Sequence, residues 1–166
     1  MMVERGGSED DRGRSRGLLA PVRYTLTWHD AQPATWRVRR LEFVESISEP
    51  YTLRILLVTD ELDADVDGLL GASCTLMLSR GAPERAVHGI ARGVELLGAV
   101  ENRLRVAVTI VPALALLADR QDTRFWQDKT TLEIVQEVLK APLRELGREF
   151  VVSADEKQYM RREYCV

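Results

Sequence analysis

Between Val22 and Ile110 the apolar residues of this chain return at every second position, in six short segments. The clearest segment runs from Leu104 to Ile110, where large apolar residues alternate with arginine, alanine and threonine. Side chains along a strand point alternately to opposite faces, so this pattern predicts strands with one buried face. The six segments are residues 22–28, 36–43, 51–58, 74–78, 87–97 and 104–110. Because turn signals separate them, they predict an antiparallel β-barrel or sandwich.

Two places in this region predict departures from regular strands. Arg39 and Arg40 sit together in the second segment, which predicts a bulge or an exposed edge. Gly89 and Gly93 interrupt the fifth segment, and glycines inside strands often mark bends at barrel corners. The chain is expected to turn at residues 98–102 before the last strand begins.

The apolar period changes after residue 111, which predicts a helical region. Pro112 suits the first turn of a helical piece, where its missing N–H is tolerated. Thr130 and Glu133 form a possible capping box in front of a longer amphipathic helix. Pro142 is expected to stop or kink that helix, with at most one further turn after it. Extended chain is predicted to restart at residues 150–152. The whole sequence therefore predicts a mainly β fold with added α: a barrel of about six strands, followed by a helical insertion.

Composition and charge narrow the class of protein. The chain has 166 residues, 45% of them apolar and 30% charged, as in soluble globular domains. Its net charge of −3 argues against general nucleic-acid binding. No apolar run approaches the roughly 20 residues that span a bilayer, so no stable membrane insertion is expected. Residues 1–17 mix acids and bases and resemble no signal peptide, so synthesis and assembly in the cytoplasm are expected, and residues 1–19 are predicted to be disordered.

The segment Asp63–Gly68 is the strongest candidate for a metal site. Its pattern, Asp-x-Asp-x-Asp-Gly, is how the loop of a helix-loop-helix calcium site begins. The twelfth position of such a loop should be a bidentate glutamate, and here it is Cys74. Strands, and not helices, are predicted on both sides. A solvated turn whose aspartates serve as turn and cap residues is therefore the preferred interpretation.

His29 and His88 are the only two histidines of the chain. His29 with Asp30 and either Ser46 or Ser48 could be imagined as a catalytic triad. The chain lacks a Gly-x-Ser-x-Gly elbow, metal-ligand spacing and a phosphate-binding glycine loop. The sequence therefore predicts no catalytic, cofactor-binding or metal-binding residues. Cys74 and Cys165 are predicted to be free thiols.

The predicted helical region carries the candidate interaction residues. Phe125 and Trp126 could form an exposed aromatic anchor for a partner or could pack in the core, and the sequence does not separate the two. Four arginines lie near acidic residues and are interpreted as ion-pair or interface residues: Arg120, Arg124, Arg161 and Arg162, beside Asp119, Asp122, Asp128 and Glu163.

A series of motifs, in order along the chain, resembles one known family. They are WRVRRLEFVESISEPY at 36–51, DGLLG at 67–71, HGIARGV at 88–94, PAL at 112–114, RFWQD at 124–128, IVQEVL at 134–139 and YMRREYCV at 159–166. Together they are similar to the N-terminal, phage-tail-hub-like region of the VgrG (Rhs-element Vgr) spike proteins of type VI secretion and related contractile injection systems. In that family the last motif runs on into more protein, so this chain is expected to be the front piece of a longer structural part.

The resemblance implies a fold and a set of partners. Residues 20–111 would be the first β-barrel of the hub, and residues 112–166 a helical insertion with the start of the next strand region. The complete protein would form a homotrimer that adapts a hexameric, Hcp-like tube to a trimeric needle. Baseplate proteins, a needle-tip protein and effectors would be the other partners. Contraction would then deliver the assembly outside the cell without a signal peptide.

Two other functions remain open at the level of sequence. A barrel of six strands with helices could bind a small ligand in a pocket. An enzyme has the weakest support, because no catalytic constellation is present. The resemblance favours a structural protein without a cofactor over both alternatives.

Overall fold

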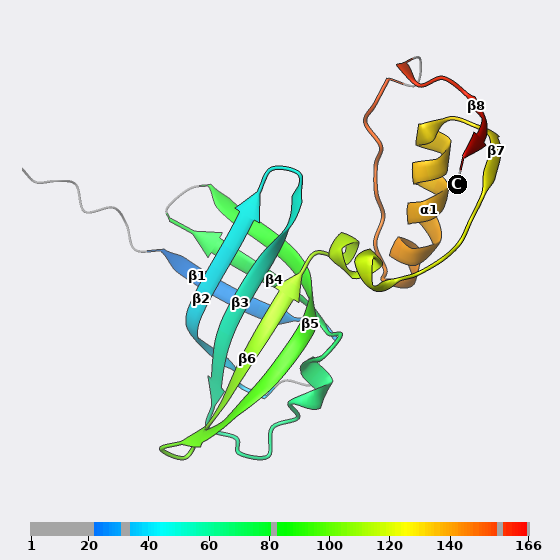
Figure 1. Cartoon of the computed structure of the whole chain (residues 1–166). Coiled ribbons are helices and arrows are strands. Elements are labelled where there is room, and N and C mark those ends of the chain that lie inside the picture. The colour runs from blue at the N-terminus through cyan, green and yellow to red at the C-terminus, as the bar shows by residue number, and fades with distance from the viewer. Residues whose placement is uncertain (1–21, 31–33, 81–82, 156–157, 166) are drawn as a thin grey trace, which may run out of the picture.

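The computed structural model describes residues 22–30, 34–80, 83–155 and 158–165. The described residues from 22 to 111 form a curled six-stranded sheet, the sheet region. Those from 112 to 165 form a smaller helical region beyond the end of that sheet (Figure 1). The predicted disordered tail, residues 1–19, lies outside the described residues. Among the described helices, none combines the length and the apolar character needed to cross a bilayer.

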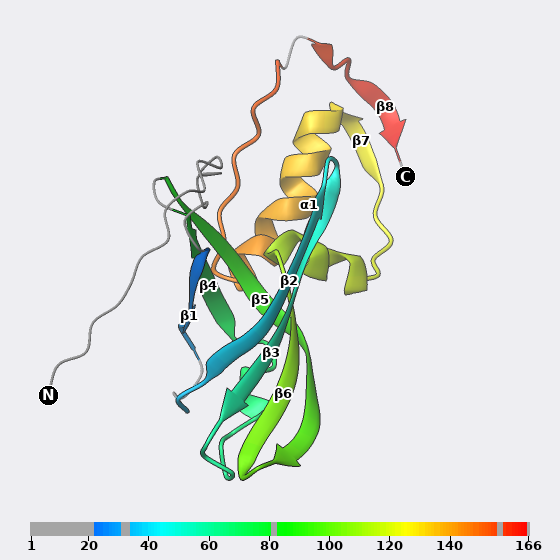
Figure 2. The ribbon, with the colours of Figure 1, turned by 90° about the vertical axis from the view of Figure 1, so that its left-hand side faces the viewer.

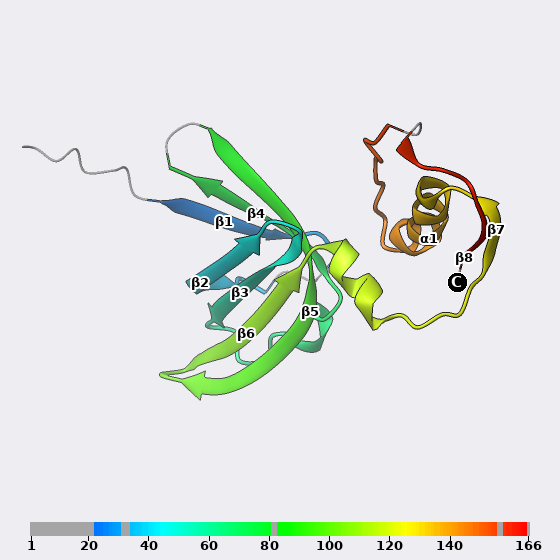
Figure 3. The same ribbon diagram turned by 45° about the horizontal axis from the view of Figure 1, so that its top comes forward.

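All six predicted strands are present and all pair antiparallel. They are β1 (Arg23–Trp28), β2 (Arg37–Ser46), β3 (Glu49–Thr59), β4 (Ser73–Ser79), β5 (Glu84–Val100) and β6 (Arg103–Val111). Their order across the sheet is β1-β4-β5-β6-β3-β2. The sheet curls into a half-barrel with β1 and β2 at its edges (Figure 3). The predicted mainly β fold followed by helix is confirmed.

The core lies on the inner face of this curled sheet, as the alternation predicts. Leu57 pairs with Val106, and both side chains have 0% of their surface exposed. Ile55 faces Val108 one step along the same ladder, and both are also buried. Leu69, from the short 3₁₀ helix η1 (Asp67–Leu69), joins this cluster. Burying such side chains is the main source of the free energy that holds the sheet together.

Bulges occur near two of the predicted places. The β2–β3 ladder shifts between Val38 and Arg40, so the predicted bulge at Arg39 is confirmed, on a strand that is also an edge. A second shift lies between Ala91 and Gly93 in β5. Gly89 marks no bend, because it pairs regularly with Cys74. Its lack of a side chain serves packing, since an added Cβ would collide with the Ile110 side chain.

The β5–β6 turn is tighter than the sequence predicts. β5 continues to Val100, and Glu101 and Asn102 alone make the turn, with φ of 51° and 59°. Positive φ at both central residues is typical of the two-residue turn whose twist matches a hairpin. Gly98, with φ of 89°, lies beside a further bulge in the strand instead of within the turn.

After β6 the chain turns helical, as predicted. The 3₁₀ helix η2 (Ala113–Asp119) follows Pro112, which is its extended N-cap and not part of its first turn. The α-helix α1 (Thr131–Glu145) begins at a capping box of Thr130 and Glu133. Pro142 does not stop the helix, which continues to Glu145. Because Pro142 lies in the last turn, its missing N–H removes only one hydrogen bond near an end that frays anyway.

A small two-stranded sheet completes the helical region. It joins β7 (Trp126–Lys129) to β8 (Arg162–Cys165), antiparallel. β8 confirms the strand expected at the last motif, whereas β7 is too short and polar to give a period-two signal. Residues 150–152 belong to no strand. An ion pair of 2.5 Å between Arg92 of β5 and Asp119 of η2 links the sheet to the helical region.

Candidate functional site

The structure joins the two histidines through a threonine. His29 Nε2 lies 2.8 Å from the Thr75 hydroxyl oxygen, and His88 Nδ1 lies 2.9 Å from the same oxygen. Thr75 is central because β4 lies between β1 and β5 in the sheet. Thr75 was not among the residues singled out from the sequence; its only signal is that Ser73, Thr75 and Met77 alternate with the buried residues of β4. The arrangement ties the end of β1 to β4 and β5.

The imagined catalytic triad does not form. Asp30 Oδ2 accepts hydrogen bonds from the backbone N–H and the hydroxyl of Ser73. These bonds hold the pKa of the Asp30 carboxyl below its ordinary range. No hydrogen bond between the described residues joins either histidine to Ser46 or Ser48. The polar groups here link strands and are not arranged as nucleophile and base.

The segment Asp63–Gly68 follows β3 as a loop and runs into η1, which begins at Asp67. Asp65 Oδ1 accepts a hydrogen bond of 2.9 Å from the Gly68 N–H, as in a turn stabilised by its own side chain. A strand precedes the loop and a single 3₁₀ turn follows it, so the helices of a calcium site are not there. In the described part of the chain, no three His, Cys, Asp or Glu side chains converge where they could hold a metal ion.

Both cysteines are free thiols, as predicted. Burial raises the pKa of Cys74 to about 11, so at neutral pH it is protonated and a poor nucleophile. Burial also raises the pKa of Tyr51 to about 12. The Tyr51 hydroxyl donates to the His88 carbonyl oxygen, a contact that Gly89 leaves room for. The Tyr51 hydrogen bond thus links β3 to β5.

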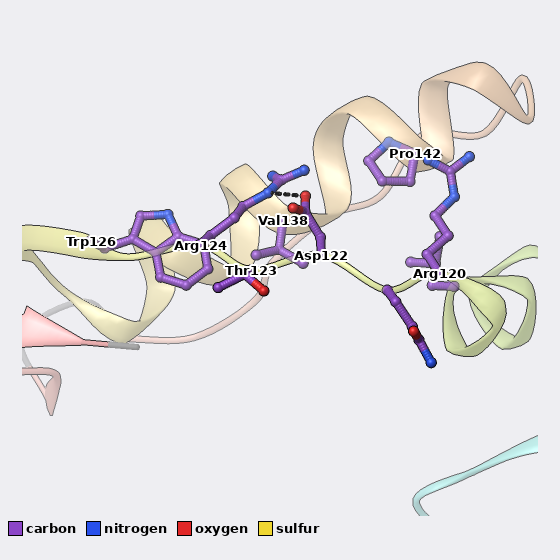
Figure 4. A pocket seen from close by; sticks show the side chains of 9 residues that line it. Arg120, Asp122, Thr123, Arg124, Trp126, Val138 and Pro142 are labelled. Atoms are coloured by element: carbon purple, nitrogen blue, oxygen red, sulfur yellow. Dashed lines mark hydrogen bonds and ion pairs between the residues drawn. The ribbon is translucent and has the colours of Figure 1, made fainter.

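The helical region contains a groove of about 640 Å³ between α1 and the segment that leads into β7 (Figure 4). Leu117, Val138, Pro142 and Trp126 give it apolar walls. Polar residues of the connecting segment 120–124 form the rest of its lining. This groove was not predicted from the sequence, because its walls come from η2, β7 and α1 and meet only in the folded chain.

Three of the four arginines interpreted from the sequence as ion-pair or interface residues form ion pairs, one of them with an acidic neighbour named there. Arg120 pairs with Glu145 of α1 at 2.5 Å, and Arg124 pairs with Asp122 at 2.5 Å, as Figure 4 shows for the second pair. Arg161 pairs with Glu133 at 3.3 Å and also donates to a backbone carbonyl of β7. The fourth, Arg162, makes no ion pair with a described residue.

The helical region exposes several large apolar side chains. Phe125 is 68% exposed, whereas its neighbour Trp126 is half-buried in the groove wall. The structure thus gives the two aromatic residues different positions, and only Phe125 has that of an exposed anchor. Further exposed apolar side chains of this region are Leu114, Val135, Val138, Val151, Tyr159, Met160 and Tyr164. Exposed apolar side chains of this kind are candidates for contact with a partner.

This chain resembles known proteins over most of its length. Residues 44–166 match the family described as phage tail baseplate hub (GPD). VgrG1b of Pseudomonas aeruginosa, a type VI secretion system spike protein, is 30% identical over 132 residues, which cover 78% of this chain and 17% of that protein. VgrG4b of the same organism, also a spike protein, is 30% identical over 128 residues, covering 74% and 15%. The chain thus spans less than a fifth of the length of these relatives.

The fold has a counterpart among solved structures. The E. coli c3393 protein is a component of the type VI secretion system that exhibits structural similarity to the T4 bacteriophage tail proteins gp27 and gp5. It matches this chain with a TM-score of 0.60 and 20% identity, over 78% of this chain and 38% of that one. At this identity the likeness establishes the hub-like fold. With the family match over most of its length, this chain belongs to the phage tail baseplate hub family, and it resembles the N-terminal region of the VgrG spike proteins.

Proposed function

We propose that this chain is the N-terminal hub part of a contractile injection spike, with a structural role in assembly. The observation that carries the proposal is the match to the baseplate hub family over residues 44–166. The exposed apolar surface of the helical region supports it, because a structural part needs surfaces that other parts cover.

Within this proposal, residues 20–111 form the first β-barrel of the hub and residues 112–166 a helical insertion. The boundary is supported by the change from sheet to helix after β6, which ends at Val111. The complete protein would be a homotrimer that adapts a hexameric, Hcp-like tube to a needle. Baseplate proteins, a needle-tip protein and effectors are the proposed further partners, and contraction would deliver the assembly outside the cell.

A structural family indicates a non-enzymatic role, and we propose that this chain catalyses no reaction. The buried Cys74 thiol, with its raised pKa, and the inter-strand role of the histidines support this. Turnover in a broad hydrolase screen that His29→Ala or His88→Ala abolishes would contradict the proposal. A small-ligand-binding barrel stays an alternative prediction, but the inner face of the sheet is filled by core side chains.

The mass of the full-length protein that contains this chain tests the proposal. Light scattering after size exclusion is expected to give a trimer, which co-elutes with a hexameric tube protein from the same genome. Replacing two exposed apolar residues of the helical region, as Phe125→Ser with Val138→Ser, is expected to weaken assembly. A monomer that never co-purifies with tube or baseplate proteins would contradict the hub function.

The matched control is Leu62→Ser, on the loop after β3. Leu62 is 49% exposed, an exposure between those of Val138 and Phe125, but it lies in the sheet region. It is expected to leave the trimer intact. Equal loss of assembly in the control and in the helical variant would assign the effect to general surface change and not to the helical region.

A further inference from the structure

The outer face of β2, β3 and β6 carries a basic groove of about 690 Å³, separate from the helical region. Figure 2 shows these three strands side by side along the length of the sheet. Arg37 and Arg39 of β2 line the groove on one side, and Arg103 and Arg105 of β6 line it on the other. Four arginines around one groove stand out in a chain whose net charge is −3.

The strand register builds this groove. Val58 of β3 faces Arg37 across one ladder and Arg105 across the next, so an apolar residue lies between two arginines. The bulge between Val38 and Arg40 sets Arg39 out of the regular alternation, and Arg39 also lines the groove. Bulges commonly re-aim a side chain in this way.

One pair of the arginines is fixed by the protein itself. Asp60 accepts hydrogen bonds from Arg37 at 2.7 Å and from Arg103 at 3.1 Å. These two bonds hold the pKa of the Asp60 carboxyl below its ordinary range. The Arg37 and Arg103 guanidinium groups are therefore oriented and partly neutralised.

The other two arginines of the groove are Arg39 and Arg105. They make no ion pair with any residue in the described ranges. Among the residues that line the groove, Glu101 is the acidic one. Guanidinium groups bind carboxylates through paired N–H donors, which suits them to carboxylate recognition. Two such groups across three strands could hold carboxylates a few residues apart on an extended chain.

The floor of the groove is apolar. Val58 is 7% exposed, Leu56 is half-buried, and Val100 is 49% exposed. An apolar floor with basic sides suits a segment that carries carboxylates and an apolar side chain. It suits nucleic acid poorly, because no aromatic residue lines the groove for a base to stack on.

We propose that this groove docks an acidic, extended segment of a partner protein. Its carboxylates bind Arg39 and Arg105, and an apolar side chain packs on Leu56 and Val100. The inference rests on charge complementarity and geometry alone, so it holds independently of the hub function.

Fluorescence anisotropy with the full chain tests the proposal. The probe is a short fluorescein-labelled peptide, rich in glutamate, with two central leucines. The double variant Arg39→Gln with Arg105→Gln is expected to weaken binding about tenfold, since it removes two charge-assisted contacts. Because Arg39 is exposed, Arg39→Gln alone gives a second readout should the double variant fail to fold.

The control removes the same charge elsewhere. Arg23→Gln in the edge strand β1, with Arg80→Gln directly after β4, removes two charges on the opposite side of the sheet. It is expected to leave the Kd within about twofold at physiological salt. An equal loss of peptide affinity in both double variants would show an effect of net charge and would overturn the proposal that the peptide binds in the groove. Absence of saturable binding by the unaltered chain would overturn it as well.

Two further results bear on the occupant. Val100→Ser is expected to weaken peptide binding about threefold through lost apolar contact, and no change would overturn the contact with the floor. A single-stranded DNA oligonucleotide is expected to bind more weakly than the peptide. Tighter binding of the DNA, lost in the Arg39 and Arg105 variant, would overturn the assignment to a protein segment.

Discussion

The sheet region, residues 22–111, and the helical region, residues 112–165, use their apolar side chains in different ways. The sheet region places them on one inner face, where Leu53, Leu57 and Val106 have no exposed surface. In the helical region only Leu132, Pro142 and Leu143 are buried among the described residues. The helical region nevertheless has well-formed local structure, with a capping box and several ion pairs.

This difference separates two sources of structure. The sheet region is organised by long-range packing between strands, which stabilises a domain by itself. The helical region is organised by local signals, which decide where a helix begins but supply little stability. A covering surface would supply the long-range packing that this region lacks, which agrees with the proposed place of the chain inside a larger assembly.

The largest expected effect tests where the core lies. Leu57→Ala is expected to lower the free energy of unfolding by about 3 kcal/mol, because it opens a cavity in a fully buried site. Urea unfolding followed by circular dichroism measures this loss. The matched change Leu114→Ala, at a side chain that is 51% exposed, is expected to cost about 0.5 kcal/mol or less. Similar losses of unfolding free energy for the two variants would contradict the contrast between a packed sheet region and an exposed helical region.

A smaller effect tests the packing at Gly89. Gly89→Ala is expected to cost about 2 kcal/mol, because its Cβ would collide with Ile110 inside the sheet. Gly93→Ala is the control, since a Cβ there meets only Thr109, at 3.9 Å. Its expected change is within about 0.5 kcal/mol of zero. If urea unfolding shows the same loss of unfolding free energy for the two variants, the close contact with Ile110 does not explain the cost of Gly89→Ala, and strand propensity does.

Much of the sheet could be predicted because its signal is local and repeats. Period-two alternation located all six strands, and the paired arginines located the bulge at Arg39. The capping box located the start of α1. The small strand β7 was not predicted, because four mostly polar residues carry no periodic signal. The sequence also did not decide whether α1 continues beyond Pro142, because the energetic cost of a proline depends on its distance from the end of the helix.

The candidate surfaces could not be predicted in the same way. The groove at Trp126 and Val138 joins residues from separate elements, and the basic groove depends on the order of the strands across the sheet. The sequence named His29 and His88 but not Thr75, which joins them. A sequence pattern shows which face of an element is apolar. It does not show which face a partner outside the chain covers.

The smallest expected effect tests the local signals of the helical region. The Thr130 backbone N–H donates to the Glu133 carboxylate at 2.6 Å, and this bond holds the pKa of Glu133 below its ordinary value of 4.5. A lowered folded pKa means that the stabilisation is fully present above pH 4.5 and is lost as the pH falls through the folded value. Hydrogen exchange of the first-turn amides of α1 is therefore expected to quicken, relative to the intrinsic rate, below pH 4.5.

Glu133→Gln separates this effect from other acids, because glutamine also serves in a capping box but does not titrate there. The variant is expected to keep α1 protected at pH 7 and to lose the part of the pH dependence that belongs to Glu133. Thr130→Ala removes the cap itself and is expected to cost about 1 kcal/mol, roughly a fivefold loss of protection in α1. Amides of β3 and β6 are expected to keep their protection in both variants. If they lose it together with α1, the two regions unfold as one unit, and the contrast between a packed sheet and a locally organised helix is wrong.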